Sequence, residues 1–379
     1  MLPPRNNAVS FKEEQLLGKK LISVQALRGI AVLLVLFFHL SEVRRHYFGM
    51  LFSSNFSSFG NAGVDLFFVI SGFVVVGVAR RVERTGARGA LDFIYDRAAR
   101  IYPIYWIYSL VLIIPFLLNP ALVNSLSRMH GAGDYLRSFL LLPNATSPVL
   151  LVGWTLVFEV YFYAILAAML LTRVPIAAAL VGWAAALIIC NLSWIGTTDA
   201  PTNPVLALVS SPLSLEFVMG AAVSYALLRP VRKRGASLLV VLAVIIVAVL
   251  CFTLDLPRED INPWFRTLVY GPIGVILLIG TVSLEELFHF RYFAWLIAIG
   301  DASYSIYLSH TLILSAAGRL LGASPLRVWG TASSIALAAA CLILGLWSYK
   351  YLETPLLRRS RGFKRKLFQT AHGGGGNTG

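Results

Sequence analysis

Ten apolar stretches, each close to the length of a membrane-spanning helix, constrain this chain of 379 residues more than any other feature. A helix needs about 20 mostly apolar residues to cross the hydrocarbon core of a bilayer. The stretches cover residues 21–40, 63–79, 103–118, 150–171, 175–192, 206–228, 237–254, 268–284, 292–318 and 328–350. They predict an all-α, polytopic integral membrane protein with about ten transmembrane helices.

The composition excludes several other classes of protein. Hydrophobic residues make up 58% of the chain and charged residues 13%, whereas soluble domains average about 45–50% apolar and about 25% charged residues. A disordered chain, a collagen-like chain and an ordinary soluble enzyme are therefore excluded. The three cysteines lie inside apolar runs, so the sequence predicts neither a disulfide framework nor a metal site.

The chain divides into three parts by composition. Residues 1–20 form a polar segment that we expect on the cytoplasmic side, and no cleavage site follows the first apolar run, so that run is expected to be an uncleaved anchor. Residues 21–355 form the transmembrane domain. Residues 356–379 form a basic and glycine-rich cytoplasmic tail, which we expect to be disordered and whose basic run suits anionic lipid headgroups.

The distribution of basic residues predicts the orientation of the chain. With the N-terminus inside and ten spans, 24 of the 32 Lys and Arg residues fall on the cytoplasmic side or at its edge. Cytoplasmic segments of membrane proteins carry such an excess. An even number of spans places both termini in the cytoplasm. The net charge of +14 is thus explained by the lipid surface, and no nucleic-acid partner is expected.

Ionisable residues inside the predicted spans mark candidate functional positions, because burying them in a bilayer is costly. Arg28 and His39 lie eleven residues apart in the first span, which places both on one helical face about 16 Å apart along the axis. Alternatively, Arg28 is an interfacial anchor and His39 a residue at the helix end. His310 in the ninth span is a secondary candidate.

The expected depths of the remaining charges separate them into two groups. Asp65 and Glu159 fall in the outer half of the bilayer with His39, whereas Arg97 and Arg100 lie at the inner face with Arg28. This separation is typical of an enzyme with an anionic donor from the cytosol and a neutral hydroxyl acceptor from outside. For the two arginines of the third span, ordinary positive-inside charge is the alternative.

The residue types suggest a separate chemical role for each of the two groups. Histidine is the usual general base for deprotonating a hydroxyl, and a carboxylate such as Glu159 or Asp65 would fix its tautomer and stabilise the imidazolium. Guanidinium forks bind phosphates. We therefore expect His39, Glu159 and Asp65 at a catalytic centre and the arginines of the inner face at a donor site.

Five sequence elements together resemble the acyltransferase-3 family of integral membrane acyltransferases over roughly residues 20–355. The elements are QALRGIAVLLVLFFH at 25–39, GVDLFFVISGF at 63–73, RAARIYP at 97–103, WTLVFE at 154–159 and YSIYLSH at 304–310. Their order and spacing match the family, although the fourth element has threonine where the family often has serine.

The resemblance implies a membrane O-acyltransferase, most often an O-acetyltransferase, in the bacterial cytoplasmic membrane. It implies that acyl-CoA, usually acetyl-CoA, is a co-substrate from the cytosol and that no cofactor is tightly bound. The acceptor would be a hydroxyl of a cell-surface or exported polysaccharide or of a glycolipid. It further implies that His39 is catalytic and that Arg28, Arg97 and Arg100 bind the donor.

Two other classes of protein remain as alternatives from the residues alone. Intramembrane charges also mark the substrate paths of transporters and flippases. Against a transporter, the sequence has no detectable internal repeat and no paired, broken helices at matching positions. A membrane sensor or interaction protein is the second alternative, for which the short loops offer little surface.

Overall fold

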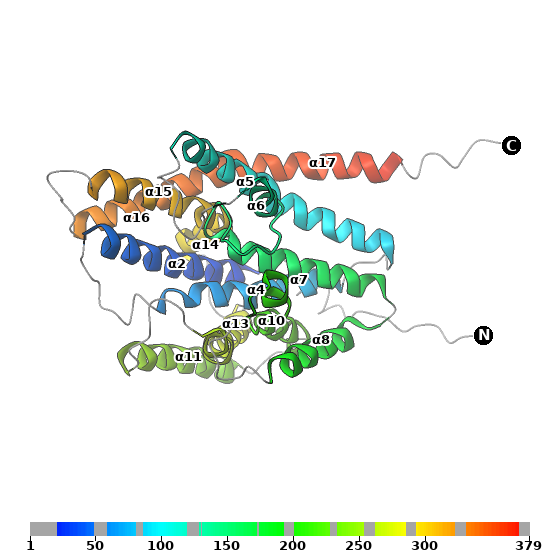
Figure 1. Cartoon of the computed structure of the whole chain (residues 1–379). Helices are drawn as coiled ribbons and strands as arrows, with labels where there is room; N and C mark the ends of the chain where they lie inside the picture. The colour runs from blue at the N-terminus through cyan, green and yellow to red at the C-terminus, as the bar shows by residue number, and fades with distance from the viewer. Residues whose placement is uncertain are drawn as a thin grey trace, which may run out of the picture.

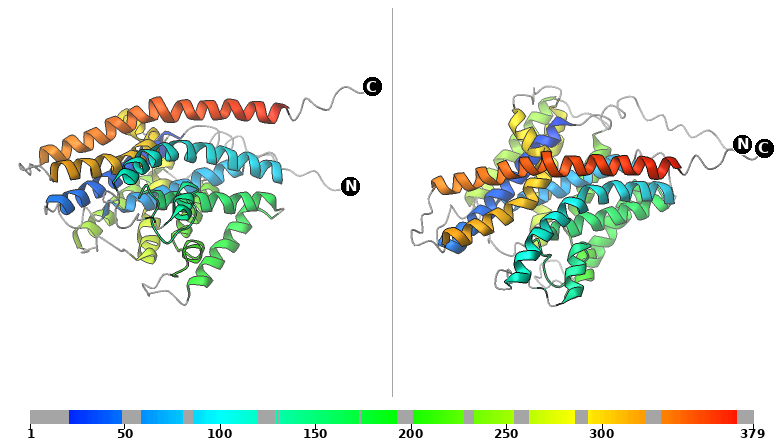
Figure 2. Two further views of the ribbon diagram at one scale, coloured as in Figure 1. Left: turned by 45° about the horizontal axis from the view of Figure 1, so that its top comes forward. Right: turned by 90° about the horizontal axis from the view of Figure 1, so that it is seen from above.

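The structure is a computed structural model, and it describes a single bundle of helices (Figure 1). The described residues are 21–48, 59–80, 86–119, 129, 131–172, 174–192, 201–227, 233–253, 262–285, 293–322 and 331–370. Every regular element among them is helical, which confirms the all-α prediction. The two further views show most helices lying side by side along one common direction (Figure 2).

The elements follow the apolar stretches of the sequence closely. They are α2 (Ile22–Phe48), α4 (Ala62–Ala79), α5 (Ala87–Leu118), α6 (Ala132–Phe139), α7 (Gly153–Leu171), α8 (Ile176–Asn191), α9 (Pro204–Val209), α10 (Ser214–Ala226), α11 (Lys233–Thr253), α12 (Pro263–Phe265), η3 (Arg266–Tyr270), α13 (Gly271–Ser283), α14 (Ala294–Asp301), α15 (Ser303–Gly322), α16 (Thr331–Ser348), η5 (Tyr349–Glu353) and α17 (Thr354–Thr370). The two η elements are π-helical segments.

Seven helical segments of the described chain are long and apolar enough to cross a membrane. They are Ile22–Tyr47, Ala62–Ala79, Ala87–Leu118, Gly153–Leu171, Pro204–Ala226, Pro263–Ser283 and Ala332–Lys366. Two shorter apolar helices, within α8 and α11, lie at two further expected spans, and the ninth expected span is divided into α14 and α15. The protein is thus a multi-pass membrane protein, while the count of ten and the orientation stay predictions.

Close contact between α4 and α10 anchors the centre of the bundle. A Cβ atom on Gly72 would overlap the backbone of Phe217, and one on Gly220 would overlap the backbone of Val69. Small residues allow membrane helices to approach this closely. Beside this contact, the ring of Phe217 stacks at 4.6 Å on Phe68 of α4 and at 4.5 Å on Phe162 of α7. The core of the bundle is therefore built around α4.

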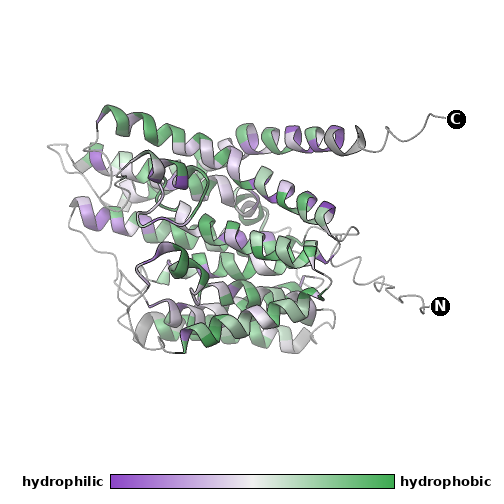
Figure 3. Cartoon of the chain, turned by 45° about the vertical axis from the view of Figure 1, so that its right-hand side comes forward, coloured by the Kyte–Doolittle hydropathy of each residue, from purple (hydrophilic) through white to green (hydrophobic). Residues whose placement is uncertain are grey.

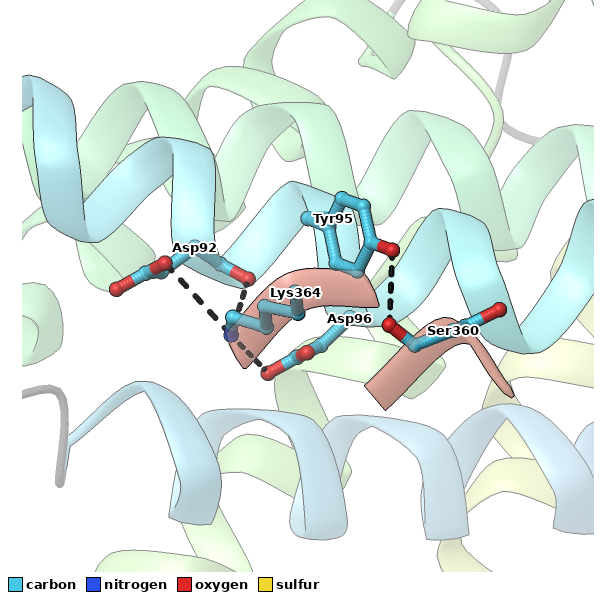
Figure 4. Close-up of polar contacts among 5 residues, drawn as sticks. All are labelled: Asp92, Tyr95, Asp96, Ser360 and Lys364. Atoms are coloured by element: carbon cyan, nitrogen blue, oxygen red, sulfur yellow. Dashed lines mark hydrogen bonds and ion pairs between the residues drawn. The ribbon is translucent and has the colours of Figure 1, made fainter. Parts of the chain in front are cut away.

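The tail of the chain differs from the expectation of disorder. Residues up to Thr370 continue α16 and η5 as the helix α17, which carries many of the hydrophilic residues seen in Figure 3. Lys364 of α17 lies 2.9 Å from Asp96 and 3.7 Å from Asp92 of α5, and Tyr95 donates a hydrogen bond to the carbonyl of Ser360 (Figure 4). These contacts order the basic segment, because they give its helix a partner. The glycine-rich end lies outside the described residues.

Candidate active site

A cavity of about 350 Å³ lies between α2, α4, α5, α7 and α15. Its wall along α4 extends from Val64 to Val75, which corresponds to about 16 Å of helix. The cavity is therefore elongated along the bundle. It falls within the size range of ordinary small-molecule sites, which is about 300–1,000 Å³.

One end of the cavity is lined by three arginines. Arg28 comes from α2, and Arg97 and Arg100 come from one face of α5, where residues three apart are neighbours. Gln25 lies in the same wall and accepts a hydrogen bond from Arg28 Nη1 at 3.4 Å. The guanidinium of Arg97 lies 5.9 Å from the ring centroid of Tyr163. Three cations facing one cavity form a site suited to a polyanionic group such as a phosphate.

Glu159 of α7 lies in this cavity beside the arginines. It accepts a short hydrogen bond from the hydroxyl of Tyr163 and a longer one, at 3.4 Å, from Ser71 Oγ. All three side chains line the cavity. Glu159 therefore offsets part of the positive charge of the arginine end. In the described part of the chain it makes no hydrogen bond to His39, so the structure does not bring it to the imidazole as expected.

A pair of histidines lies beyond the other end of the cavity. His39 Nδ1 is 3.0 Å from the carbonyl of Val35 and 3.3 Å from His310 Nε2, and His310 Nδ1 is 3.1 Å from the carbonyl of Ile306. A carbonyl only accepts hydrogen bonds, so both Nδ1 atoms carry the proton when the rings are neutral. His310 Nε2 then accepts a hydrogen bond from His39 Nδ1, and His39 Nε2 keeps a free lone pair.

This tautomer assignment gives the histidine pair a clear chemical capability. Nε2 of His39 is the basic atom, and His310 takes the place that a carboxylate was expected to fill. His310 is buried, with 1% of its surface exposed, whereas His39 is partly exposed. The pair can therefore accept a proton at His39 from a hydroxyl and stabilise the resulting imidazolium through His310.

Tyr307 connects the cavity to the histidine pair. It lines the cavity, and its ring centroid is 5.8 Å from that of His310. Its hydroxyl is 2.9 Å from Thr155 Oγ1, which also lines the cavity. Because α15 carries Tyr307 and His310 one turn apart, the order along the bundle is the arginines, Glu159, Tyr307 and then the histidines.

Asp65 belongs to a different cluster. Both of its carboxylate oxygens accept hydrogen bonds from Arg266, at 3.0 Å each, and both residues are buried. Glu216 of α10 is also buried, and it interacts electrostatically with both Asp65 and Arg266. The expected contact of Asp65 with His39 is therefore not formed, because a fully buried carboxylate is stabilised by the nearest guanidinium.

The sequence did not point to two further buried charged residues, Arg266 and Glu353. Arg266 lies between the predicted stretches 237–254 and 268–284, but the π-helical segment η3 places it inside the bundle, with 7% of its surface exposed. Glu353 of η5 is buried at 1% exposure and accepts a hydrogen bond from Ser305 Oγ at 2.6 Å. Glu353 lies three residues beyond the last predicted apolar stretch, which ends at residue 350. No group of three or more metal-ligating side chains occurs among the described residues.

Fold and site together define a class of protein: a multi-pass, all-helical membrane protein with a cavity that is cationic at one end and adjoins a histidine pair at the other. The chain belongs to the acyltransferase-3 family, because the family's acyltransferase domain matches residues 21–349. It is therefore an acyltransferase, and the alternatives of a transporter and a sensor are not supported. No solved structure shows a significant match to the chain.

Two curated relatives are similar over most of the chain. The exopolysaccharide production protein ExoZ of Rhizobium meliloti is 33% identical over 337 residues, which cover 86% of this chain and 95% of ExoZ. The peptidoglycan O-acetyltransferase OatA of Listeria monocytogenes is 25% identical over 384 aligned positions, which cover 91% of this chain. The chain spans only 58% of the length of OatA.

Proposed function

We propose that this acyltransferase moves an acetyl group from cytosolic acetyl-CoA to a hydroxyl of an exported or cell-surface polysaccharide. The observation that carries the proposal is the cavity itself, which begins at Arg28, Arg97 and Arg100 and ends beside Tyr307 and the histidine pair. Its length of about 16 Å along α4 suits the extended arm between the phosphates and the thioester of CoA.

The arginine end receives the donor. Guanidinium groups bind phosphates through parallel charge-assisted hydrogen bonds, and the three arginines line the same cavity, so they can bind one polyanionic group together. Glu159 offsets part of the mutual repulsion of these cations when no donor is bound, and its hydrogen bond from Tyr163 holds it in place. CoA acts as a co-substrate and leaves after each turnover.

The histidine end carries out the transfer. His39 Nε2 accepts the proton of the acceptor hydroxyl while the hydroxyl oxygen attacks the thioester carbonyl. The tetrahedral intermediate collapses when its bond to sulfur breaks, and His39 returns the proton to the departing sulfur. The products are the O-acetylated acceptor and free CoA thiol, so atoms and charge balance without any further reactant.

The two relatives support the nature of the acceptor and of the acyl group. One is an exopolysaccharide production protein and the other a peptidoglycan O-acetyltransferase, so a glycan hydroxyl and an acetyl group are the choices they favour. We place the protein in the bacterial cytoplasmic membrane, with both termini in the cytoplasm. In Figure 1 the start of α5 and the end of α17 lie toward the same side of the bundle, in agreement with this orientation.

The decisive test uses membranes from a bacterial strain that lacks its own copy of the gene. Membranes carrying the wild-type protein are expected to transfer radiolabel from acetyl-CoA to the polysaccharide of that strain. His39→Ala should reduce the rate by about 10²- to 10⁴-fold, the usual contribution of a general base. His46→Ala is the matched control, since His46 is exposed at the end of the same helix. Full transfer by a correctly inserted His39→Ala variant would refute the mechanism.

A further inference from the structure

We infer that Tyr307 sets the length of the acyl group that the enzyme accepts and that Thr155 holds its ring in place. This inference rests on the proposed function, because that function places the acyl end of the donor at the outer end of the cavity. It adds a specificity-determining residue and the residue that positions it.

Tyr307 is fixed on two sides. Its hydroxyl is 2.9 Å from Thr155 Oγ1 and 3.3 Å from the carbonyl of Val152, both on or next to α7. Its backbone belongs to α15, and its ring packs edge-on against Phe67 of α4 at 6.0 Å. The side chain therefore bridges α15 and α7 at the outer end of the cavity, and it is buried at 7% exposure.

The apolar side chains in this part of the cavity fit an alkyl group, so we expect size, and not polarity, to limit the acyl group. Val64, Phe67 and Leu156 line the cavity near Tyr307, and these apolar side chains would accept a longer alkyl chain if space were present. The next group beyond the ring is His310, at 5.8 Å between ring centroids. A longer chain would have to displace Tyr307, because close-packed interiors do not yield to added methylene groups without strain.

Thr155 is the positioning residue for this wall. Its hydroxyl lies 3.0 Å from the carbonyl of Val152, and the same carbonyl is also within hydrogen-bond distance of the Tyr307 hydroxyl. Valine has nearly the shape of threonine and lacks the hydroxyl, so Thr155→Val would remove the closer of the two hydrogen-bond partners of the Tyr307 hydroxyl and loosen the ring, while the carbonyl of Val152 and the helix packing are kept. Thr155→Ser would keep the hydrogen bond.

The test measures donor binding to the detergent-purified full chain, so that no acceptor is needed. Dissociation constants for CoA, acetyl-CoA and butyryl-CoA are determined by isothermal titration calorimetry. We expect the wild-type protein to bind butyryl-CoA at least about 10-fold more weakly than acetyl-CoA. Tyr307→Leu should bring the two constants within about 2-fold of each other. Thr155→Val should shift the ratio in the same direction, and Thr155→Ser should keep the wild-type ratio.

Tyr304→Leu is the matched control, because it makes the same change in the same cavity one turn nearer the arginines, where Tyr304 donates to the carbonyl of Ile101. It should leave the ratio at the wild-type value. An unchanged ratio in Tyr307→Leu, or an equal shift in Tyr304→Leu, would overturn the inference. If Tyr307→Leu does not fold, an unchanged ratio in Thr155→Val has the same consequence. If CoA itself does not bind the wild-type protein, the proposed donor fails as well.

Discussion

His39 obtains its hydrogen-bond partner from a second histidine and not from a carboxylate. A carboxylate buried next to the imidazole would need its own compensating cation, because an unpaired buried charge is costly. Asp65 illustrates this point, since it is paired with Arg266 through both oxygens. A histidine such as His310 carries no charge in its neutral form, and in that form its Nε2 can accept the Nδ1 proton of His39. The pairing therefore orients the base without burying a negative charge.

The role of His310 leads to a prediction at the residue scale. His310→Ala removes one of the two acceptors of the His39 Nδ1 proton, leaves the carbonyl of Val35 in place, and should lower kcat by about 10- to 100-fold. A hydrogen bond to a charged group contributes about 1.5–3 kcal/mol, and each 1.36 kcal/mol is tenfold in rate. KM for acetyl-CoA should change little, because the arginines bind the donor at the other end of the cavity.

Steady-state kinetics with the purified protein would measure both constants. His310→Gln is the informative companion, because its side-chain oxygen can accept the same proton and should recover part of the lost kcat. A rise in KM with kcat unchanged in His310→Ala would show that His310 serves donor binding and not the orientation of His39.

At the scale of single elements, α5 and α17 act together. Arg97 and Arg100 of α5 line the cavity. Asp92 and Asp96 of the same helix form ion pairs with Lys364 of α17. Asp96 directly precedes Arg97 in the sequence. The docking of α17 thus holds the part of α5 from which the donor site is built.

Reversing the charge of this contact gives the prediction for these elements. Lys364→Glu should destabilise the purified protein by about 1 kcal/mol, the upper end for partly exposed ion pairs, and should weaken binding of acetyl-CoA. Adding Asp96→Lys should recover part of both losses, because it restores an attraction at the closer of the two contacts. Thermal unfolding and calorimetry would measure the two effects.

Lys364→Met provides the control, since it keeps much of the aliphatic stem and removes only the charge. It should have a smaller effect than Lys364→Glu. If the double variant is as unstable as Lys364→Glu alone, the contact does not hold α17 on α5.

Helical periodicity and counting of charges predicted some features of single elements well. Arg97 and Arg100, three residues apart, were expected on one face and line one cavity. The described helices overlap the predicted apolar stretches, with the exception of α6, α12 and α17. The start of the segment that contains η3 was not predicted, because the apolar stretch begins at residue 268 whereas the helical segment begins at Pro263 and continues through η3. Arg266 was therefore misplaced in a loop.

At the scale of the whole molecule, the sequence predicted how far along its span each charged side chain lies, but not which helices are neighbours. His39 and His310 are 271 positions apart, and Asp65 and Arg266 are 201 apart. Counting along each span predicts how deep a side chain lies in the bilayer. It does not predict which helices are adjacent, since that depends on contacts such as the close approach of α4 and α10 at Gly72. The partners of Asp65 and Glu159 consequently required the structure.

The number of spans and the orientation lead to the last prediction. Ten spans place His46 and Thr202 outside and Arg361 in the cytoplasm. If only the seven longest apolar segments crossed the membrane, both Thr202 and Arg361 would lie on the opposite sides. All three residues are exposed, so single cysteines can report their positions after the native Cys190, Cys251 and Cys341 are replaced by alanine.

We expect a membrane-impermeant maleimide to label His46→Cys and Thr202→Cys in intact cells, and Arg361→Cys only after permeabilisation. The bias of 24 of the 32 basic residues toward one side favours this result, because basic residues are retained in the cytoplasm. His46 serves as the internal control, since it is outside in either arrangement. Labelling of Arg361→Cys in intact cells, with protection of Thr202→Cys, would refute the ten-span arrangement and would also contradict the contact of Lys364 with the start of α5, which would then lie on the opposite side of the membrane.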